Sequence, residues 1–183
     1  MLTVNDDTRL EKEWDYEKNE ALGLFPDKLG LGSEKKAYPL IIQQMQSLAE
    51  ISADPIAVMA NVSSLLFHGM EAVNWAGFYL VKDGALLLGP FQGKAACVKI
   101  EKGKGVCGTA WAEDRLQLVP DVHAFPGHIA CDGASRSEIV VPIHRDGNVF
   151  AVLDIDSPLP ARFTQEDAAG LAALAAALEA ILG

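Results

Sequence analysis

Apolar residues recur with the period of an α-helix in three stretches of the chain. Residues 38–51 carry such a pattern, and a second one follows Asp54 and Pro55, which suit an N-cap and a first helical position. A third helix is predicted from Thr164, its expected N-cap, to Leu182. The third pattern is apolar over a wide arc, so we expect it to pack against the first helix and to leave apolar surface for a dimer contact.

Between these helices, apolar and polar residues alternate as they do in β-strands. Residues 74–82 and 85–91 predict a hairpin that turns at Asp83-Gly84, and residues 137–144 and 148–156 predict another. Residues 95–100 and 116–119 are expected to form two shorter strands, with a helical turn between them. Helices at both ends and about six strands joined mainly as hairpins predict an α+β domain with an antiparallel sheet.

Residues 1–36 differ from the rest of the chain in composition. They carry nine acidic and six basic side chains, together with several glycines and a proline. Such a stretch is typical of a partly mobile terminal arm. We therefore expect an N-terminal extension over residues 1–36 and a single domain over residues 37–183.

The charge balance excludes several classes of partner. The chain has 25 acidic and 15 basic residues, and its net charge of -10 repels phosphate backbones and anionic membrane surfaces. No apolar run reaches the roughly 18 residues of a membrane-spanning helix, and the first residues are acidic where a leader peptide would be basic. We expect a cytoplasmic protein that binds neither nucleic acid nor membranes.

The candidate chemistry lies between Cys97 and Asp156. The three cysteines Cys97, Cys107 and Cys131 are an odd number in a chain without an export signal, so reduced thiols are expected rather than a disulfide framework. Cys131 lies within residues 120–136, the longest stretch without a helical or strand period, and long loops of this kind are usually functional. The thiols can then be catalytic, metal-binding or structural.

The residue spacing favours neither phosphate binding nor metal binding in this region. The glycine-rich residues 103–108 are not followed by the Lys-Ser/Thr pair of a phosphate-binding loop. His123 and His128 lie near Cys131, but no CxxC or HxxxH pair accompanies them. No metal site is therefore expected.

Strand alternation brings acidic and aromatic side chains to common faces. Asp154 and Asp156 share one face of the last strand, about 7 Å apart. The opposite face of that strand is expected to be apolar and to consist of Val149, Ala151, Leu153 and Ile155. Trp75 and Tyr79 share a face of the first strand in the same way. By themselves, a solvated sheet face and a packed core explain these pairs as well as a binding site does.

From about Tyr38 to its end, the chain resembles the free methionine-(R)-sulfoxide reductases, which are stand-alone GAF-fold enzymes. The resemblance rests on the spacing of the cysteines, which GAF ligand sensors do not share, and on the strings NWAGFYL, LGPFQGKAAC, GKGVCGTAW, VPDVHAFPGHIACD, SRSEIVVPI and VLDIDS. It implies a GAF-like fold whose N- and C-terminal helices pack on one face of the sheet. It also implies reduction of free methionine-(R)-sulfoxide, recycling by thioredoxin, a homodimer, and no metal or organic cofactor.

The resemblance further implies three groups of site residues. These are the redox cysteines Cys97, Cys107 and Cys131, the aromatic residues Trp75 and Tyr79 around the substrate, and the acidic cluster of Glu138, Asp154 and Asp156.

Sulfoxide reduction by thiols explains why these residue types occur together. A thiolate attacks the sulfoxide sulfur while an acid protonates the oxygen, and a second thiol converts the resulting sulfenic acid into a disulfide. We expect Cys131 to be the nucleophile because it lies in the long loop just before the acidic hairpin, with Cys107 as the alternative and Cys97 as the recycling partner.

Carboxylates also suit the ammonium group of a free amino acid. Asp156 is expected to supply the proton, and Glu138 and Asp154 to bind the ammonium, although the sequence leaves this division open. The alternative function is a GAF module that senses a small ligand or the redox state without turnover.

Overall fold

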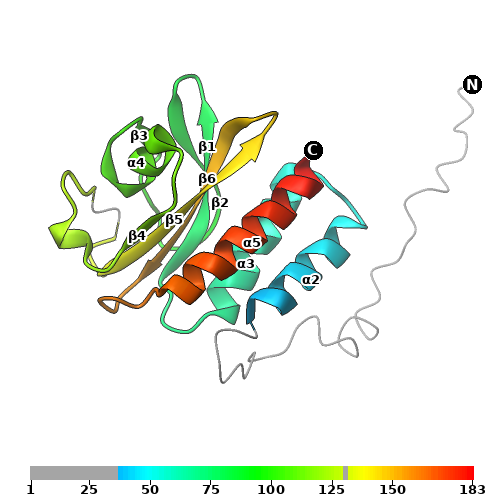
Figure 1. Ribbon diagram of the computed structural model, residues 1–183, viewed down its shortest axis with the longest axis horizontal. Coiled ribbons are helices and arrows are strands. Elements are labelled where there is room, and N and C mark those ends of the chain that lie inside the picture. The colour runs from blue at the N-terminus through cyan, green and yellow to red at the C-terminus, as the bar shows by residue number, and fades with distance from the viewer. Residues whose placement is uncertain (1–36, 130–131) are drawn as a thin grey trace, which may run out of the picture.

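The computed structural model describes residues 37–129 and 132–183, which form a six-stranded sheet with helices on both faces (Figure 1). In chain order the elements are α2 (Ala37–Ala49), α3 (Pro55–Gly69), β1 (Trp75–Lys82), β2 (Ala85–Gly93), β3 (Lys99–Glu101), α4 (Gly105–Glu113), β4 (Gln117–Val119), η2 (Val122–Ala124), β5 (Ser137–Arg145), β6 (Asn148–Ser157) and α5 (Gln165–Leu182). The expected extension over residues 1–36 lies outside the described residues.

The sheet has the strand order β3-β2-β1-β6-β5-β4, and every pair of neighbouring strands is antiparallel. The two predicted hairpins are present. Their turns, Asp83-Gly84 and Asp146-Gly147, have φ between 51° and 74° at both residues. Such positive φ values are required in the tight turns that match the twist of antiparallel strands.

The predicted helix starts are confirmed by the hydrogen bonds of their caps. Asp54 accepts from the backbone N–H groups of Ile56 and Ala57, and Pro55 follows it at the first helical position. Thr164 and Asp167 cap the start of α5 reciprocally, since each side chain accepts from the other's backbone N–H. These bonds satisfy amide groups that have no partner within the helix.

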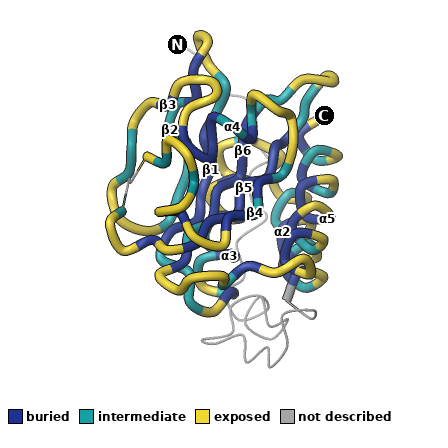
Figure 2. The backbone as a smooth tube through the Cα atoms, turned by 60° about the vertical axis from the view of Figure 1, so that its left-hand side comes forward, coloured by how far each residue is buried: buried dark blue, intermediate teal, exposed yellow. Residues whose placement is uncertain are grey.

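Two apolar cores lie on opposite faces of the sheet. The larger one packs the sheet against α3 and α5, with α2 beside them, and contains Ala76 and Phe78 of β1. The smaller one lies under α4 and contains Trp75 and Tyr79. The alternation of β1 therefore separates its side chains as predicted, and Figure 2 shows that the buried stretches follow β1, β5 and β6 through the middle of the molecule.

Three details differ from the sequence-based expectation. The strand expected over residues 95–100 is confined to Lys99–Glu101, and the preceding residues cross the edge of the site instead. The expected helical turn is a nine-residue helix, α4. Val149 packs against the smaller core rather than with Ala151, because the register of β5 and β6 shifts between Ile143 and His144.

The wide apolar arc of α5 is explained by its two neighbours. The helix packs on β5 and also on α2, as predicted, so its leucines are buried on more than one side. Among the described residues no helix is long and apolar enough to cross a membrane.

Candidate active site

The sheet register places the predicted acidic and aromatic residues in one row. Asp156 of β6 pairs with Trp75 of β1 on one side and with Glu138 of β5 on the other. Asp154 pairs with Gly77, which has no side chain to fill the space in front of it. A Cβ atom at Gly77 would collide with Phe91 and Trp75, so glycine permits this close packing.

The carboxyl groups of Glu138 and Asp154 are buried under α4 and that of Asp156 is half-buried, which changes their acidity. Glu138 and Asp154 are each only 6% exposed. Burial raises the pKa of Asp154 from 3.8 to about 7. Burial also raises the pKa values of Glu138 and Asp156 well above their usual range, and the charge of Asp154 adds to both shifts. The cluster can therefore hold protons near neutral pH, as a proton donor must.

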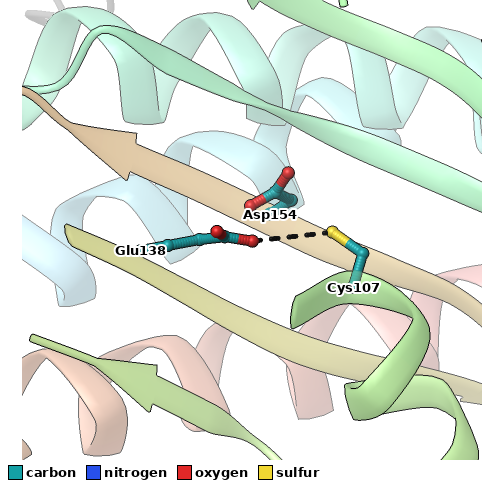
Figure 3. Close-up of side chains that lie close together, drawn as sticks. All are labelled: Cys107, Glu138 and Asp154. Atoms are coloured by element: carbon teal, nitrogen blue, oxygen red, sulfur yellow. Dashed lines mark hydrogen bonds between the residues drawn. The ribbon is translucent and has the colours of Figure 1, made fainter. Parts of the chain in front are cut away.

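Cys107 faces this cluster from α4 (Figure 3). Its Sγ donates a hydrogen bond to Glu138 Oε1 over 3.8 Å, and the side chain is 4% exposed. Burial, followed by the charges of Asp154 and Glu138, raises the pKa of the Cys107 thiol well above its usual value. The thiol is thus held neutral, although the N-terminal turn of a helix alone would favour the thiolate.

Gly108 lets α4 approach the sheet closely enough to bury Cys107. A Cβ atom at Gly108 would collide with the carbonyl oxygen of Glu101 in β3. The Gly108 carbonyl in turn accepts a 2.8 Å hydrogen bond from the Gly103 N–H. The glycine-rich stretch therefore serves the packing of α4.

Aromatic side chains form one wall of the site. Trp75 stacks against Tyr79 with ring centroids 5.8 Å apart and against Phe91 at 5.3 Å. The indole Nε1 donates to the carbonyl of Lys94 over 3.1 Å, which fixes the ring orientation. Phe91 was not identified from the sequence, but the hairpin register that pairs it with Gly77 is the signal that points to it.

Asp132 anchors the loop that precedes β5. It accepts hydrogen bonds from Asn74 Nδ2 and Lys94 Nζ, each over 3.3 Å, and from the Ala134 N–H over 3.0 Å. The Ala134 bond is the main cause that lowers the pKa of Asp132. Asn74 also donates to Ser135 Oγ over 3.1 Å. The contacts made by Asn74 and Lys94 were not anticipated from the sequence, because they join segments about 40 to 60 residues apart.

His128 lies at the edge of the carboxyl cluster. Its Nε2 is 3.9 Å from Glu138 Oε2, and its ring centroid is 6.4 Å from that of His123. Burial and the neighbouring His123 lower the pKa of His128. The neutral imidazole therefore faces Glu138 at neutral pH.

The described residues include seven of the eight predicted site residues, and six of these line two adjoining cavities of about 30 and 10 Å³: Trp75, Tyr79, Cys107, Glu138, Asp154 and Asp156. Both cavities also contact Asp132. Cys97 lies apart from both linings; it is half-buried and packs against the smaller core just before β3. It is disulfide-bonded, so the expectation that all three thiols are reduced was wrong for Cys97. Cys131 lies outside the described residues.

The sequence and the fold of this chain are similar to those of known proteins. The family model described as GAF domain matches residues 52–182. The free methionine-R-sulfoxide reductase of Escherichia coli (strain K12) is 55% identical over 127 residues, which cover 69% of this chain and 77% of the relative.

The chain belongs to the free methionine-R-sulfoxide reductases of the GAF domain family.

Solved structures of these reductases have the same fold. The Neisseria meningitidis reductase in complex with its substrate superimposes with a TM-score of 0.79 at 42% identity, over 82% of this chain and 90% of the other. The reduced form of the Staphylococcus aureus enzyme gives 0.77 at 50% identity, over 80% and 95%. The expected GAF-like fold is confirmed. The close homologues that are named free methionine-R-sulfoxide reductases are oxidoreductases.

Proposed function

We propose that this chain reduces free L-methionine-(R)-sulfoxide to L-methionine. The observation that carries the proposal is the buried cluster of Glu138, Asp154 and Asp156 beside the stacked ring of Trp75, with raised pKa values at all three carboxyls. An apolar wall suits the methyl thioether end of the substrate, and carboxylates suit its ammonium group. A protein-bound methionine sulfoxide has no free ammonium group to offer.

The raised pKa values allow the cluster both to bind the substrate ammonium group and to donate a proton. A cation entering it lowers the pKa of the nearest carboxyls, so Glu138 and Asp154 would ionise and pair with the ammonium. A proton that remains within the cluster is then available to the sulfoxide oxygen. Asp156 is our proposed donor because it pairs with Trp75 across the sheet and so lies beside the aromatic wall.

The first chemical step would transfer oxygen from the substrate to a cysteine. The Cys131 thiolate attacks the sulfoxide sulfur and forms a transient sulfur–sulfur bond, while the Asp156 proton goes to the oxygen. The hydroxyl then moves from the substrate sulfur to Cys131 as that bond breaks, so methionine leaves and Cys131 becomes a sulfenic acid. The neutral, buried Cys107 is poorly suited to this attack at neutral pH, which supports Cys131 over the alternative.

A second thiol would complete the reaction. Its sulfur attacks the sulfenic acid, a disulfide forms, and the oxygen leaves as water. We propose Cys97 for this step, because its side chain is half-buried and is disulfide-bonded in this structure. An external dithiol such as thioredoxin would then reduce the disulfide by thiol exchange. The homodimer is proposed on the family resemblance, and the cytoplasmic location on the pattern of charged and apolar residues in the sequence.

The choice of substrate tests the proposal directly. The purified chain with thioredoxin, thioredoxin reductase and NADPH should consume NADPH only when L-methionine-(R)-sulfoxide is added, and not with the S epimer. The N-acetyl derivative lacks the ammonium charge, and leaving a buried carboxylate unpaired costs about 3 kcal/mol, so kcat/KM should fall about 10²-fold. Equal kcat/KM for the N-acetyl compound would refute the enclosed ammonium site, and no turnover at all would favour a sensor.

A further inference from the structure

Cys107, Glu138 and Asp154 form a compact set of metal-ligating atoms. The sulfur and one oxygen of each carboxyl group lie within 4.8 Å of one another, and all three residues are buried. They come from three different elements, α4, β5 and β6, and Figure 3 shows the Cys107 and Glu138 side chains pointing toward one another with Asp154 alongside. Because 31 residues separate Cys107 from Glu138, no local spacing in the sequence could reveal this set.

The distances suit a tetrahedral metal ion. Zinc binds sulfur at about 2.3 Å and oxygen at about 2.0 Å, which places the two ligand atoms about 3.5 Å apart. Cys107 Sγ and Glu138 Oε1 are already 3.8 Å apart. His128 Nε2 is 3.9 Å from Glu138 Oε2 but lies outside the group of atoms within 4.8 Å of one another, so the imidazole would have to move toward Cys107 and Asp154 to supply a fourth ligand. One sulfur, one nitrogen and two oxygens favour Zn²⁺ over Mg²⁺ or Ca²⁺, which take oxygen ligands.

A second observation is one carboxyl oxygen of the cluster that has no hydrogen-bond partner in the residues that the structure describes. Asp154 Oδ1 is buried and has no hydrogen-bond partner among the described residues. Asp154 lines the larger cavity, and no lysine or arginine within the described part of the chain forms an ion pair with it or with Glu138. An unpartnered buried carboxyl oxygen is unfavourable, and a bound cation would compensate it.

We propose that Cys107, Glu138, Asp154 and His128 form a Zn²⁺ site that is mutually exclusive with the substrate. Binding replaces the S–H bond of Cys107 by a sulfur–zinc bond, and the thiol and carboxyl protons pass to solvent. No electron is transferred, so the metal is released again by a chelator. The mutual exclusion rests on the proposed function, because it requires the substrate ammonium to use the same carboxyl groups.

Cobalt titration of the reduced, metal-free protein tests the site without any activity assay. Co²⁺ occupies zinc sites, and a thiolate ligand gives it an intense near-ultraviolet charge-transfer band. The wild type should show this band, and Zn²⁺ should abolish it stoichiometrically. Cys107→Ser should lose the band, whereas Cys97→Ser should keep it.

The Co²⁺ affinities of substituted proteins test the carboxyl and imidazole ligands. Asp154→Asn and His128→Gln should each weaken Co²⁺ binding at least about 10-fold, because each removes a ligand. Asp121→Asn is the matched control, since Asp121 is exposed and its carboxylate bonds to His123, which is not one of the four proposed ligands. A band that survives in Cys107→Ser, or equal affinities for Asp154→Asn and Asp121→Asn, would overturn the site. If circular dichroism shows that Cys107→Ser does not fold, the Co²⁺ affinities of Asp154→Asn and Asp121→Asn decide whether the metal site exists.

Reductase assays with and without Zn²⁺ distinguish the metal site from the proposed function. Zn²⁺ should raise the KM for methionine sulfoxide with little change in kcat, and a chelator should restore the original KM. Cobalt binding through Cys107 in a protein without reductase activity would leave the metal site standing and refute the function. Reductase activity that Zn²⁺ lowers only through kcat would leave the function standing and refute the mutual exclusion.

Discussion

Replacing Asp154 with asparagine should stabilise the protein at neutral pH, because the native fold holds this carboxyl group where ionisation is unfavourable. Burial raises its pKa from 3.8 to about 7. Well below pH 3.8 the group is protonated in both the folded and the unfolded states. As the pH rises toward 7 the unfolded chain loses this proton first, so the folded state loses stability across that interval. Asparagine does not ionise and avoids the loss.

The size of the effect follows from the shift. Each pKa unit corresponds to about 1.4 kcal/mol. At pH 5 the unfolded carboxyl is ionised and the native one is not, which costs about 1.7 kcal/mol, and at pH 8 the full shift of about three units costs about 4 kcal/mol. The stability of Asp154→Asn relative to the wild type should therefore rise by about 2.5 kcal/mol from pH 5 to pH 8. Glu138 and Asp156 add in the same direction, since the charge of Asp154 contributes to their raised pKa values.

Urea unfolding of the reduced proteins at pH 5 and pH 8 measures this difference. Asp121→Asn is the control: hydrogen bonds from His123 lower the pKa of Asp121, so it is ionised in both states over this range. Its relative stability should not change between the two pH values. A difference between Asp154→Asn and the wild type that is the same at both pH values would refute the argument that burial raises this pKa.

Three further predictions concern catalysis and packing. Asp156→Asn should slow single-turnover methionine formation by about 10², the usual loss for a general acid. The wild-type rate should fall between pH 5 and 9 as the acid loses its proton, and the same fall in Asp156→Asn would place the donor elsewhere. Cys131→Ser should abolish even one turnover, whereas Cys97→Ser should yield one stoichiometric methionine and then stop; a full burst from Cys131→Ser would move the nucleophile to another cysteine. Gly108→Ala should lower the free energy of unfolding by about 1–3 kcal/mol in urea because its Cβ collides with a β3 carbonyl, whereas Gly133→Ala, with open space around it, should not.

The sequence alone determined the features that depend on neighbouring residues. The Asp54 and Thr164 caps and the Asp83-Gly84 turn were predicted correctly because hydrogen bonds and φ values within a few residues decide them. The shared face of Asp154 and Asp156 followed from the two-residue period of a strand. The roles of Cys131 and of residues 1–36, which lie outside the described residues, stay predictions.

Only the tertiary structure decided that these side chains form a buried site. Alternation cannot tell a solvated sheet face from a covered one, and it is the packing of α4 over β5 and β6 that buries Asp154 and raises its pKa. The contact between Cys107 and Glu138 and the anchoring of Asp132 by Lys94 likewise join distant segments. Such contacts depend on strand order and on the close approach of whole elements, which short-range sequence patterns do not specify.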